Sequence, residues 1–321
     1  MIIVCGEALV DVVPPLDGAG YLSKPGGSPA NVAVGLGRLG VDCRLLARLS
    51  RDHFGQMIRR HLLDSRVDLS LAVDAVQPTT VAMVRLNAAG DAAYTFYVAE
   101  ATDGAWRVDD IPTDLAPGAA LHVSGSLALA VPGMHVSFGR LMRREHGRRV
   151  ISLDPNPRLA LTPDVGVWAT ALREWVGLAD IVKISEEDLA WTFPDRAIDE
   201  VAATLRGYGP AVVIVTRGGD GVYALGPAGA VSLPGLTVDV VDTVGAGDAF
   251  TAGLLTSLEV SGHLSLSALP VLTEEALIDA LRFAQQVAAI TCSRPGADPP
   301  WLAELPVGPT AEALRQSRIG G

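Results

Sequence analysis

The chain has few cysteines and almost no lysine. Cys5, Cys43 and Cys292 are scattered and odd in number, and no Cys-x-x-Cys pair occurs. These features exclude a disulfide framework and a cysteine-based zinc site, and they predict a protein of the reducing cytoplasm. The two lysines, Lys24 and Lys183, stand against many arginines. A lysine retained in such a chain hints at a position that needs a compact charge rather than a planar one.

Long apolar runs and excess positive charge are also missing. No run approaches the roughly 20 residues that span a bilayer. The N-terminus, MIIVCGEALVDVV, lacks the basic start of a signal peptide. The net charge of −11 argues against nucleic acid and anionic membranes as partners. We therefore expect small-molecule ligands, including anionic ones that backbone amides and a few cations can bind.

The apolar content is sufficient for a single α/β domain over residues 1–321. Hydrophobic residues make up 49% of the chain and charged residues 19%, which supports a sizeable core. Apolar β-rich runs alternate with helical patterns, and this predicts a doubly wound, mostly parallel central sheet covered by helices. The expected strands are 2–6, 43–50, 120–125, 149–156, 180–185 and 211–218; the expected helices are 29–39, a segment following Asp248, and 274–292.

Two segments interrupt this alternation. Residues 8–23 combine a short strand, a Pro-Pro turn and a Gly-rich loop, and residues 79–98 read as two strands joined by a turn at Ala88–Asp91. We expect both to form a small β-sheet lid over the carboxyl ends of the central strands, where ligands bind. The alternative is that they extend the main sheet.

Residues 242–248, Asp-Thr-Val-Gly-Ala-Gly-Asp, are the most informative stretch of the chain. A Gly-rich turn that opens a helix aims backbone amides at one point, and the helix dipole adds positive charge there. An acid beside such an anion site suits phosphoryl transfer. Asp248 would take a proton from the attacking hydroxyl while the amides of Gly245, Ala246 and Gly247 hold the phosphoryl oxygens. The simpler alternative is an ordinary helix start with a capping acid.

A second motif, Gly26-Gly27-Ser28-Pro29-Ala30-Asn31, precedes the first helix. The glycine pair lets backbone approach a ligand, and the Asn31 amide both donates and accepts hydrogen bonds, as a polyol requires. Asp11 is flanked by apolar residues, which favours a carboxylate that accepts sugar hydroxyls. The alternatives are a helix cap at Ser28, a merely polar Asn31 and a surface turn at Asp11.

The pattern Gly35-x-Gly37-x-x-Gly40 matches the residue spacing of a dinucleotide-binding fingerprint but not its structural position. That fingerprint needs its glycines between a strand and a helix, whereas these lie inside and at the end of the predicted helix 29–39. A dinucleotide site is therefore not expected. The phosphate-loop pattern GxxxxGK[ST] is also absent, which excludes that class of kinase.

Three further polar groups follow predicted strands. Asp154, Asn156 and Arg158 lie in SLDPNPR, and Arg158 either holds an anion or hydroxyl of the ligand or is solvated in a Pro-rich turn. The acids of Lys183-Ile-Ser185-Glu186-Glu187-Asp188 either cap a helix or attract hydrated magnesium. Thr216-Arg217-Gly218-Gly219 either lines a nucleotide phosphate path or forms a hairpin turn.

Taken together, GGSPANVAVGLGRLG and DTVGAGDAF resemble the two signature regions of the ribokinase-like (PfkB) sugar kinases, in order, spacing and chain length. The segments KISEEDL, DPNPR and TRGGDGVY are similar to the fructokinase branch. The resemblance covers residues 1–305 and implies a doubly wound α/β domain with a β lid. It also implies ATP, Mg²⁺ and K⁺ as the nucleotide and ions of the reaction.

The resemblance implies roles for the matching residues. Asp248 would be the base, with the Gly245–Gly247 amides as the anion hole. The implied sugar site is Asp11, Gly26, Gly27, Asn31 and Arg158. The implied nucleotide site is Lys183, Ser185, Thr216, Gly218, Gly219 and Gln285. The implied monovalent-cation site is Asp242, Val244 and Gly296, near the loop Cys292–Gly296. The family's Asn-x-x-Glu pattern reads Ser185-Glu186-Glu187-Asp188 here, so Asp188 matches the magnesium position only through its charge.

The sequence thus predicts an ATP-dependent kinase that phosphorylates a primary hydroxyl of a monosaccharide, with fructose as the first expectation. A 2-keto-3-deoxygluconate kinase is the main alternative, because Arg158 would pair with the carboxylate of a sugar acid. A sugar-binding regulator without catalysis is the alternative from another class. The free edges of a β lid would also favour a homodimer formed through the lid.

Overall fold

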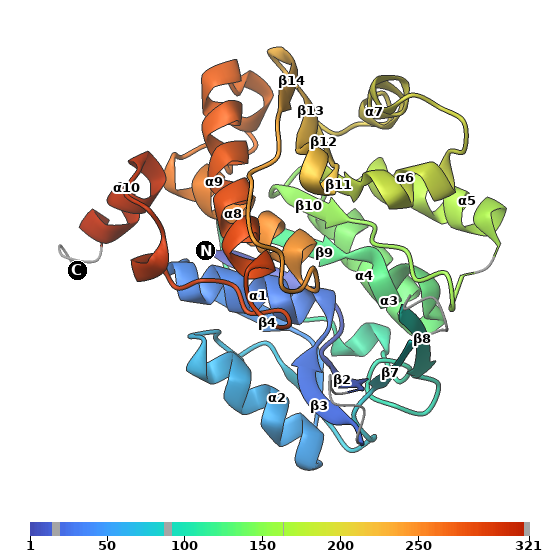
Figure 1. The fold of residues 1–321 in the computed structure, drawn as a ribbon. Helices are drawn as coiled ribbons and strands as arrows, with labels where there is room; N and C mark the ends of the chain where they lie inside the picture. The colour runs from blue at the N-terminus through green and yellow to red at the C-terminus, as the bar shows by residue number, and fades with distance from the viewer. Residues whose placement is uncertain (15–19, 87–91, 163, 318–321) are drawn as a thin grey trace.

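A computed structural model describes residues 1–14, 20–86, 92–162 and 164–317, and Figure 1 shows their arrangement. The core of the molecule is an eight-stranded sheet. Its strands, in spatial order, are β14 (Gly229–Leu233), β13 (Val222–Gly226), β12 (Val212–Thr216), β11 (Ile181–Ser185), β10 (Ile151–Asp154), β9 (Ala120–Ser124), β1 (Ile2–Cys5) and β4 (Cys43–Leu46). The strands from β4 to β12 are parallel, and β13 and β14 continue the sheet as antiparallel strands.

Helices cover both faces of this sheet, and alternation along the strands explains why. Ile2 and Val4 point to one face and Ile3 and Cys5 to the other, and all four are fully buried. One face packs on α1 (Ser28–Leu39), α2 (His53–Asp64), α8 (Ala246–Val260) and α9 (Glu274–Cys292). The other packs on α3 (Gly125–Ala130), α4 (Pro132–Glu145), α5 (Val165–Val176), α6 (Glu186–Thr192) and α7 (Ile198–Arg206). The doubly wound fold expected from the sequence is confirmed.

A short C-terminal helix, α10 (Pro309–Ser317), packs on the outside of the α8 and α9 layer. Ala311 and Leu314 of this helix join a small apolar cluster with Phe283 and Val287 of α9. No helix in the described ranges is long and apolar enough to cross a membrane.

A second, four-stranded sheet lies apart from the central one. Its order is β3 (Leu22–Gly26), β2 (Leu9–Val13), β7 (Val81–Leu86) and β8 (Ala92–Tyr97). Figure 1 shows it beside the N-terminal half of the molecule. The alternative in which these segments extend the central sheet does not hold for the described strands. The turn predicted at Ala88–Asp91 lies outside the described residues.

One predicted strand differs in the structure. Residues 43–50 divide at Ala47 into β4, which belongs to the central sheet, and β5 (Arg48–Ser50), which pairs with β6 (Val73–Ala75) in a separate two-stranded sheet. Apolar residues continue on both sides of Ala47 and no turn residue stands there, so periodicity alone could not reveal the change of partner. The predicted helices match closely: α1 begins one residue early at Ser28, and α8 begins at Ala246.

Candidate active site

The Gly-rich turn before α8 carries the acid singled out in the sequence. Gly245 has a left-handed backbone with φ of 76°, and a Cβ there would lie 2.5 Å from the Cβ of Ala297. Glycine is therefore needed both for the conformation and for the close approach. The turn delivers Asp248 to the first helical turn, where the residue is 8% exposed. The acid thus sits beside the positive end of α8.

The amides of this turn are not equivalent. The N–H of Ala246 donates to the carbonyl of Thr243 at 3.2 Å. Within the described residues, no acceptor is found for the N–H groups of Gly245 and Gly247. In this conformation these two amides are therefore the ones free to meet an anion, and Ala246 is already occupied.

Helix α1 contacts both oxygens of the Asp248 carboxylate. The hydroxyl of Ser28 donates to Oδ1 at 2.6 Å, and Nδ2 of Asn31 donates to Oδ2 at 2.8 Å. Ser124, at the end of β9, donates in turn to the Ser28 hydroxyl at 3.0 Å. The two signature motifs therefore meet in space. The interpretation of Ser28 as a helix cap is wrong, since Gly27 holds the cap position and no side chain caps the helix.

Asp11 lies close to the same place, on β2 of the small sheet. Its carboxylate rests against Gly26, where a Cβ would lie 2.0 Å from Oδ2. Burial raises the pKa of Asp11 to about 6; the charge of Arg158 lowers it and the charge of Asp248 raises it further. Arg158 donates from Nε to the hydroxyl of Ser126 at 3.0 Å. The structure thus brings Asp11 and Arg158 within electrostatic reach of each other, and Asp11 within reach of Asp248.

Glu7 is a member of this region that the sequence did not single out. It is 1% exposed, and its Oε2 has no hydrogen-bond partner in the described part of the chain. A Cβ on Gly27 would lie 2.9 Å from the carbonyl oxygen of Glu7, so Gly27 lies directly over it. Burial raises the pKa of Glu7, and the charge of Arg158 opposes the increase. The only available signal was an acid directly after a buried strand.

Lys183 extends from β11 towards the α8 turn. Its ammonium donates to Oδ2 of Asp154 at 2.9 Å, and both residues are buried. A Cβ on Gly247 would lie 2.8 Å from Nζ of Lys183, so the ammonium borders the anion site. Burial lowers the pKa of Lys183, but the neighbouring Asp154 carboxylate outweighs that effect and raises it overall. The lysine therefore remains charged.

Ser185 and Asp188 form the start of α6. The Ser185 hydroxyl accepts from the N–H of Asp188 at 3.0 Å and caps the helix, and the acids of the motif form the first turn of α6. Burial raises the pKa of the Asp188 carboxyl, while Ser185 and the charge of Lys183 lower it. The nearby Asp154 leaves its buried Oδ1 without a partner among the described residues. Carboxylate oxygens such as these are ligands that Mg²⁺ accepts.

The remaining nucleotide-site candidates lie further along the same edge. Thr216 ends β12, and the backbone turns through Gly218–Asp220 into the antiparallel β13, so the hairpin interpretation is confirmed. The spaces beside Gly218 and Gly219 contain no other described atom within 4 Å, which leaves this backbone open to a ligand. Gln285 of α9 donates from Nε2 to the carbonyl of Pro234 at 2.8 Å, so that side chain is held by a loop rather than free.

Asp242, Val244 and Gly296 are brought together. Oδ1 of Asp242 accepts from the N–H of Val244 at 3.0 Å, and Oδ2 accepts from the N–H of Gly296 at 2.7 Å. In the described ranges, no three His, Cys, Asp or Glu side chains gather as a metal cluster. In this conformation both oxygens of Asp242 accept backbone N–H groups, so a monovalent cation would have to share these oxygens and take its other ligands from loop carbonyls.

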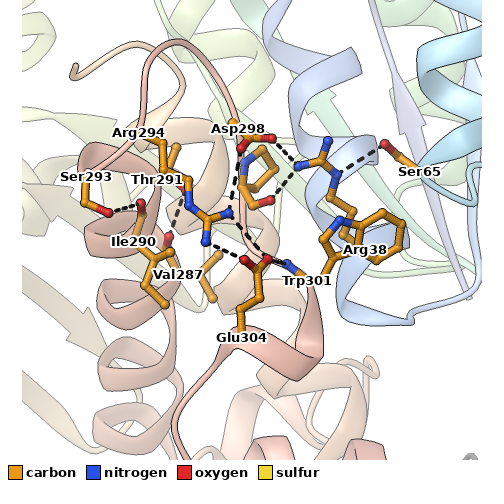
Figure 2. A network of polar contacts seen from close by, with 11 residues as sticks. Arg38, Ser65, Val287, Ile290, Thr291, Ser293, Arg294, Asp298, Trp301 and Glu304 are labelled. Atoms are coloured by element: carbon orange, nitrogen blue, oxygen red, sulfur yellow. Dashed lines mark hydrogen bonds and ion pairs between the residues drawn. The ribbon is translucent and has the colours of Figure 1, made fainter. Parts of the chain in front are cut away.

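A polar network braces the loop that carries Gly296 and Ala297 (Figure 2). Arg38 of α1 donates to Oδ1 of Asp298 at 2.5 Å and to the carbonyl of Pro299 at 2.7 Å. Arg294 pairs with Glu304 at 2.6 Å. The guanidinium of Arg38 also lies over the Trp301 ring, 5.4 Å from its centroid. The network fixes the loop against α1 and so holds Ala297 against Gly245.

Comparison with known proteins identifies the family. The model of the pfkB family of carbohydrate kinases matches residues 1–304. The chain belongs to this family. It is 37% identical over 262 residues to a fructokinase of Klebsiella pneumoniae, covering 81% of this chain and 84% of that protein. The sequence-based expectation of a pfkB carbohydrate kinase of the fructokinase branch is confirmed.

Solved structures of pfkB-type sugar kinases share the whole architecture. A fructokinase double mutant from Vibrio cholerae, with fructose, ADP and potassium ion bound, is 30% identical with a TM-score of 0.81, covering 92% of this chain and 93% of that one. A fructokinase from Xylella fastidiosa with bound ATP is 27% identical with a TM-score of 0.84, covering 99% and 98%. The chain is accordingly an ATP-dependent sugar kinase of ribokinase-like fold. As predicted, Gly35 and Gly37 lie inside α1 and Gly40 ends it, so these glycines do not form a dinucleotide fingerprint.

Proposed function

We propose that this pfkB kinase transfers the γ-phosphoryl group of ATP to a primary hydroxyl of fructose, with Asp248 as the base. The observation that carries the proposal is the position of the Asp248 carboxylate. It lies in the first turn of α8, next to two unpartnered amides and close to the ammonium of Lys183. A base beside a cationic anion hole is the arrangement that phosphoryl transfer requires. The fructokinase relatives support fructose as the sugar.

In the proposed reaction Asp248 accepts the proton of the sugar's primary hydroxyl. The hydroxyl oxygen forms a bond to the γ-phosphorus, and the bond from that phosphorus to the bridging oxygen breaks, leaving ADP. The amides of Gly245 and Gly247 and the charge of Lys183 stabilise the negative charge on the moving phosphoryl oxygens. The Ala246 amide would join them only after it leaves the carbonyl of Thr243.

The proposed sugar site combines the small sheet and the start of α1. Asp11 would accept two sugar hydroxyls, with backbone contacts at Gly26 and Gly27. Asn31 would exchange hydrogen bonds with another hydroxyl while it holds Asp248. Arg158 donates from Nε to Ser126, and its positive charge lowers the pKa of Asp11. The small sheet would then act as a lid over the sugar.

The proposed nucleotide site follows the carboxyl ends of β11 and β12. Lys183, Ser185, Thr216, Gly218, Gly219 and Gln285 would line it, in order from the phosphates to the base. Asp188 would hold Mg²⁺, aided by the free oxygen of Asp154. When bound, the metal neutralises the charge of the phosphate oxygens. Asp242, with the backbone of Val244 and Gly296, would hold a potassium ion beside the α8 turn.

The experiment that tests this proposal measures ATP consumption by the purified protein with fructose, ribose, 2-keto-3-deoxygluconate, tagatose 6-phosphate and adenosine, each with and without potassium. Strong turnover with fructose alone supports the proposal. Turnover with the keto acid instead retains the kinase and assigns Arg158 to the substrate carboxylate. Absence of turnover with every acceptor, in folded protein that binds ATP, removes the catalytic proposal and favours the sugar-binding regulator.

We also propose a cytoplasmic homodimer formed through the small sheet. This part of the molecule exposes Tyr21, Leu22, Tyr94 and Tyr97, with Tyr97 58% exposed. The edge strands β3 and β8 each have one unpaired side within the described residues, and such edges favour association. The three unpaired cysteines support the cytoplasmic location. Light scattering at working concentration tests the dimer, and a monomeric mass would contradict it.

A further inference from the structure

Asp248 is held by a chain of two buried hydroxyls that starts on a different layer of the molecule. Ser124 at the end of β9 donates to Ser28 at 3.0 Å, and Ser28 donates to Oδ1 of Asp248 at 2.6 Å. Ser124 is fully buried and Ser28 is 3% exposed. The direction is fixed at one end, because an ionised carboxylate only accepts hydrogen bonds. Ser28 must therefore direct its proton to Asp248, which leaves its oxygen to accept from Ser124.

Ser124 stands where a hydroxyl ordinarily caps a helix. It occupies the cap position of α3 in an extended conformation, yet makes no capping hydrogen bond. A serine at a cap position usually stabilises its helix through that bond. This stabilisation is forgone in α3, and the Ser124 hydroxyl donates to Ser28 instead. Ser28 is the first residue of α1, after the cap residue Gly27, and its hydroxyl serves the carboxylate.

The second donor makes the arrangement a clamp. Ser28 and Asn31 are three residues apart, so they share one face of α1. Their groups reach the two different oxygens of the same carboxylate. Two fixed donors on two oxygens set the plane of the group, whereas Asn31 alone would leave it free to turn. Each oxygen keeps a lone pair for the proton of the attacking hydroxyl.

We propose that Ser28 is a positioning residue for Asp248, and that Ser124 acts on Asp248 only through Ser28. The proposal rests on the proposed role of Asp248 as base. Ser28 itself does not touch the sugar in this account. It orients the carboxylate for proton transfer. The effect should therefore appear in kcat, and little in the KM for the sugar.

The test compares Ser28→Ala, Ser124→Ala and the double variant in steady-state kinetics with fructose and ATP. We expect Ser28→Ala to lower kcat by about tenfold, the usual consequence of losing one hydrogen bond to a charged group. Its KM for fructose should stay within about twofold. Ser124→Ala should lower kcat by a smaller factor, and the double variant should equal Ser28→Ala, because Ser124 has no separate route to Asp248.

Ser137 of α4 supplies the matched control. It is fully buried, and its hydroxyl has no partner among the described residues. Ser137→Ala should therefore leave kcat and the KM for fructose unchanged. A Ser28→Ala enzyme with wild-type kcat would overturn the proposal, as would additive losses in the double variant. If Ser28→Ala failed to fold, Ser124→Ala would carry the test, and an unchanged kcat there would overturn it. An inactive wild-type protein would instead refute the proposed function.

Discussion

The ammonium of Lys183 lies 2.9 Å from Oδ2 of Asp154, and the pair is buried directly behind Gly247 of the α8 turn. A buried ion pair contributes little to stability as such, because desolvation of two charges offsets their attraction. Its value here lies in its position. It keeps a compact positive charge beside the anion hole, in a chain that otherwise uses arginine almost throughout.

Removing this ammonium should affect both folding and catalysis. Lys183→Met leaves the Asp154 carboxylate buried and unpaired, which should lower the free energy of unfolding by about 3 to 5 kcal/mol. It should also lower kcat, since the anion hole loses its cation. Urea unfolding and steady-state kinetics measure the two effects.

The double variant Lys183→Met with Asp154→Leu separates them. Replacing both charges by apolar groups should recover most of the lost stability. The kcat should remain low, because no cation has been restored and the Asp154 oxygen proposed to aid Asp188 at the metal is also lost. Recovery of activity together with stability would show that Lys183 serves the fold alone.

Asp11 should make sugar binding dependent on pH. Burial raises its pKa to about 6, so the side chain is charged above that pH and neutral below it. The charged form is the better acceptor of sugar hydroxyls, and kcat/KM for the sugar should therefore fall as the pH drops through about 6. Asp11→Asn should weaken sugar binding and abolish this limb. A limb that persists unchanged in Asp11→Asn would assign it to another group.

Gly245→Ala should damage the site through the backbone. The residue would have to keep a φ of 76°, and its Cβ would lie 2.5 Å from that of Ala297. Left-handed backbone costs a non-glycine residue about 1 to 2 kcal/mol before any steric overlap is counted. We expect a lower Tm and a larger fall in kcat. Gly262→Ala is the matched control, since it shares a φ of 76° at an open position; it should affect Tm alone.

The Arg38–Asp298 contact should matter more than an ordinary surface pair. Arg38→Met removes the bonds to Asp298 and Pro299 together with the guanidinium that lies over the Trp301 ring. Because Asp298 is half-exposed, we expect a stability loss of only about 1 to 2 kcal/mol. The freed loop should also lower kcat. The control Arg44→Met breaks the more exposed pair with Asp68; an equal effect on kcat there would contradict a specific role for the brace.

Much of this account was predictable because the informative signals are local. The buried parallel strands are short apolar runs, and Gly245 and Gly40 mark backbone conformations that glycine alone adopts easily. Asp11, Asn31 and Asp248 were selected by type and by place in a motif, and the fold brings them together.

Other features depend on contacts that no spacing encodes. Nothing in residues 43–50 predicts that β5 leaves the central sheet, because apolar residues continue from β4 through Ala47 into β5 without a turn residue. Ser28 reads as a cap until Asp248, 220 residues away in the sequence, is found beside it. The Lys183–Asp154 pair and the burial of Glu7 could not be predicted from the sequence either, because both depend on how the ends of the central strands meet in the sheet.

The most direct test of the central claim is the kcat of Asp248→Asn with fructose and ATP, measured beside its affinity for each. Asparagine preserves the size of the side chain and accepts from Ser28, but it is not a base. The account predicts a fall in kcat of at least about 100-fold, the usual order for a positioned base, with little change in fructose or ATP binding. A variant that turns over near the wild-type rate would contradict it.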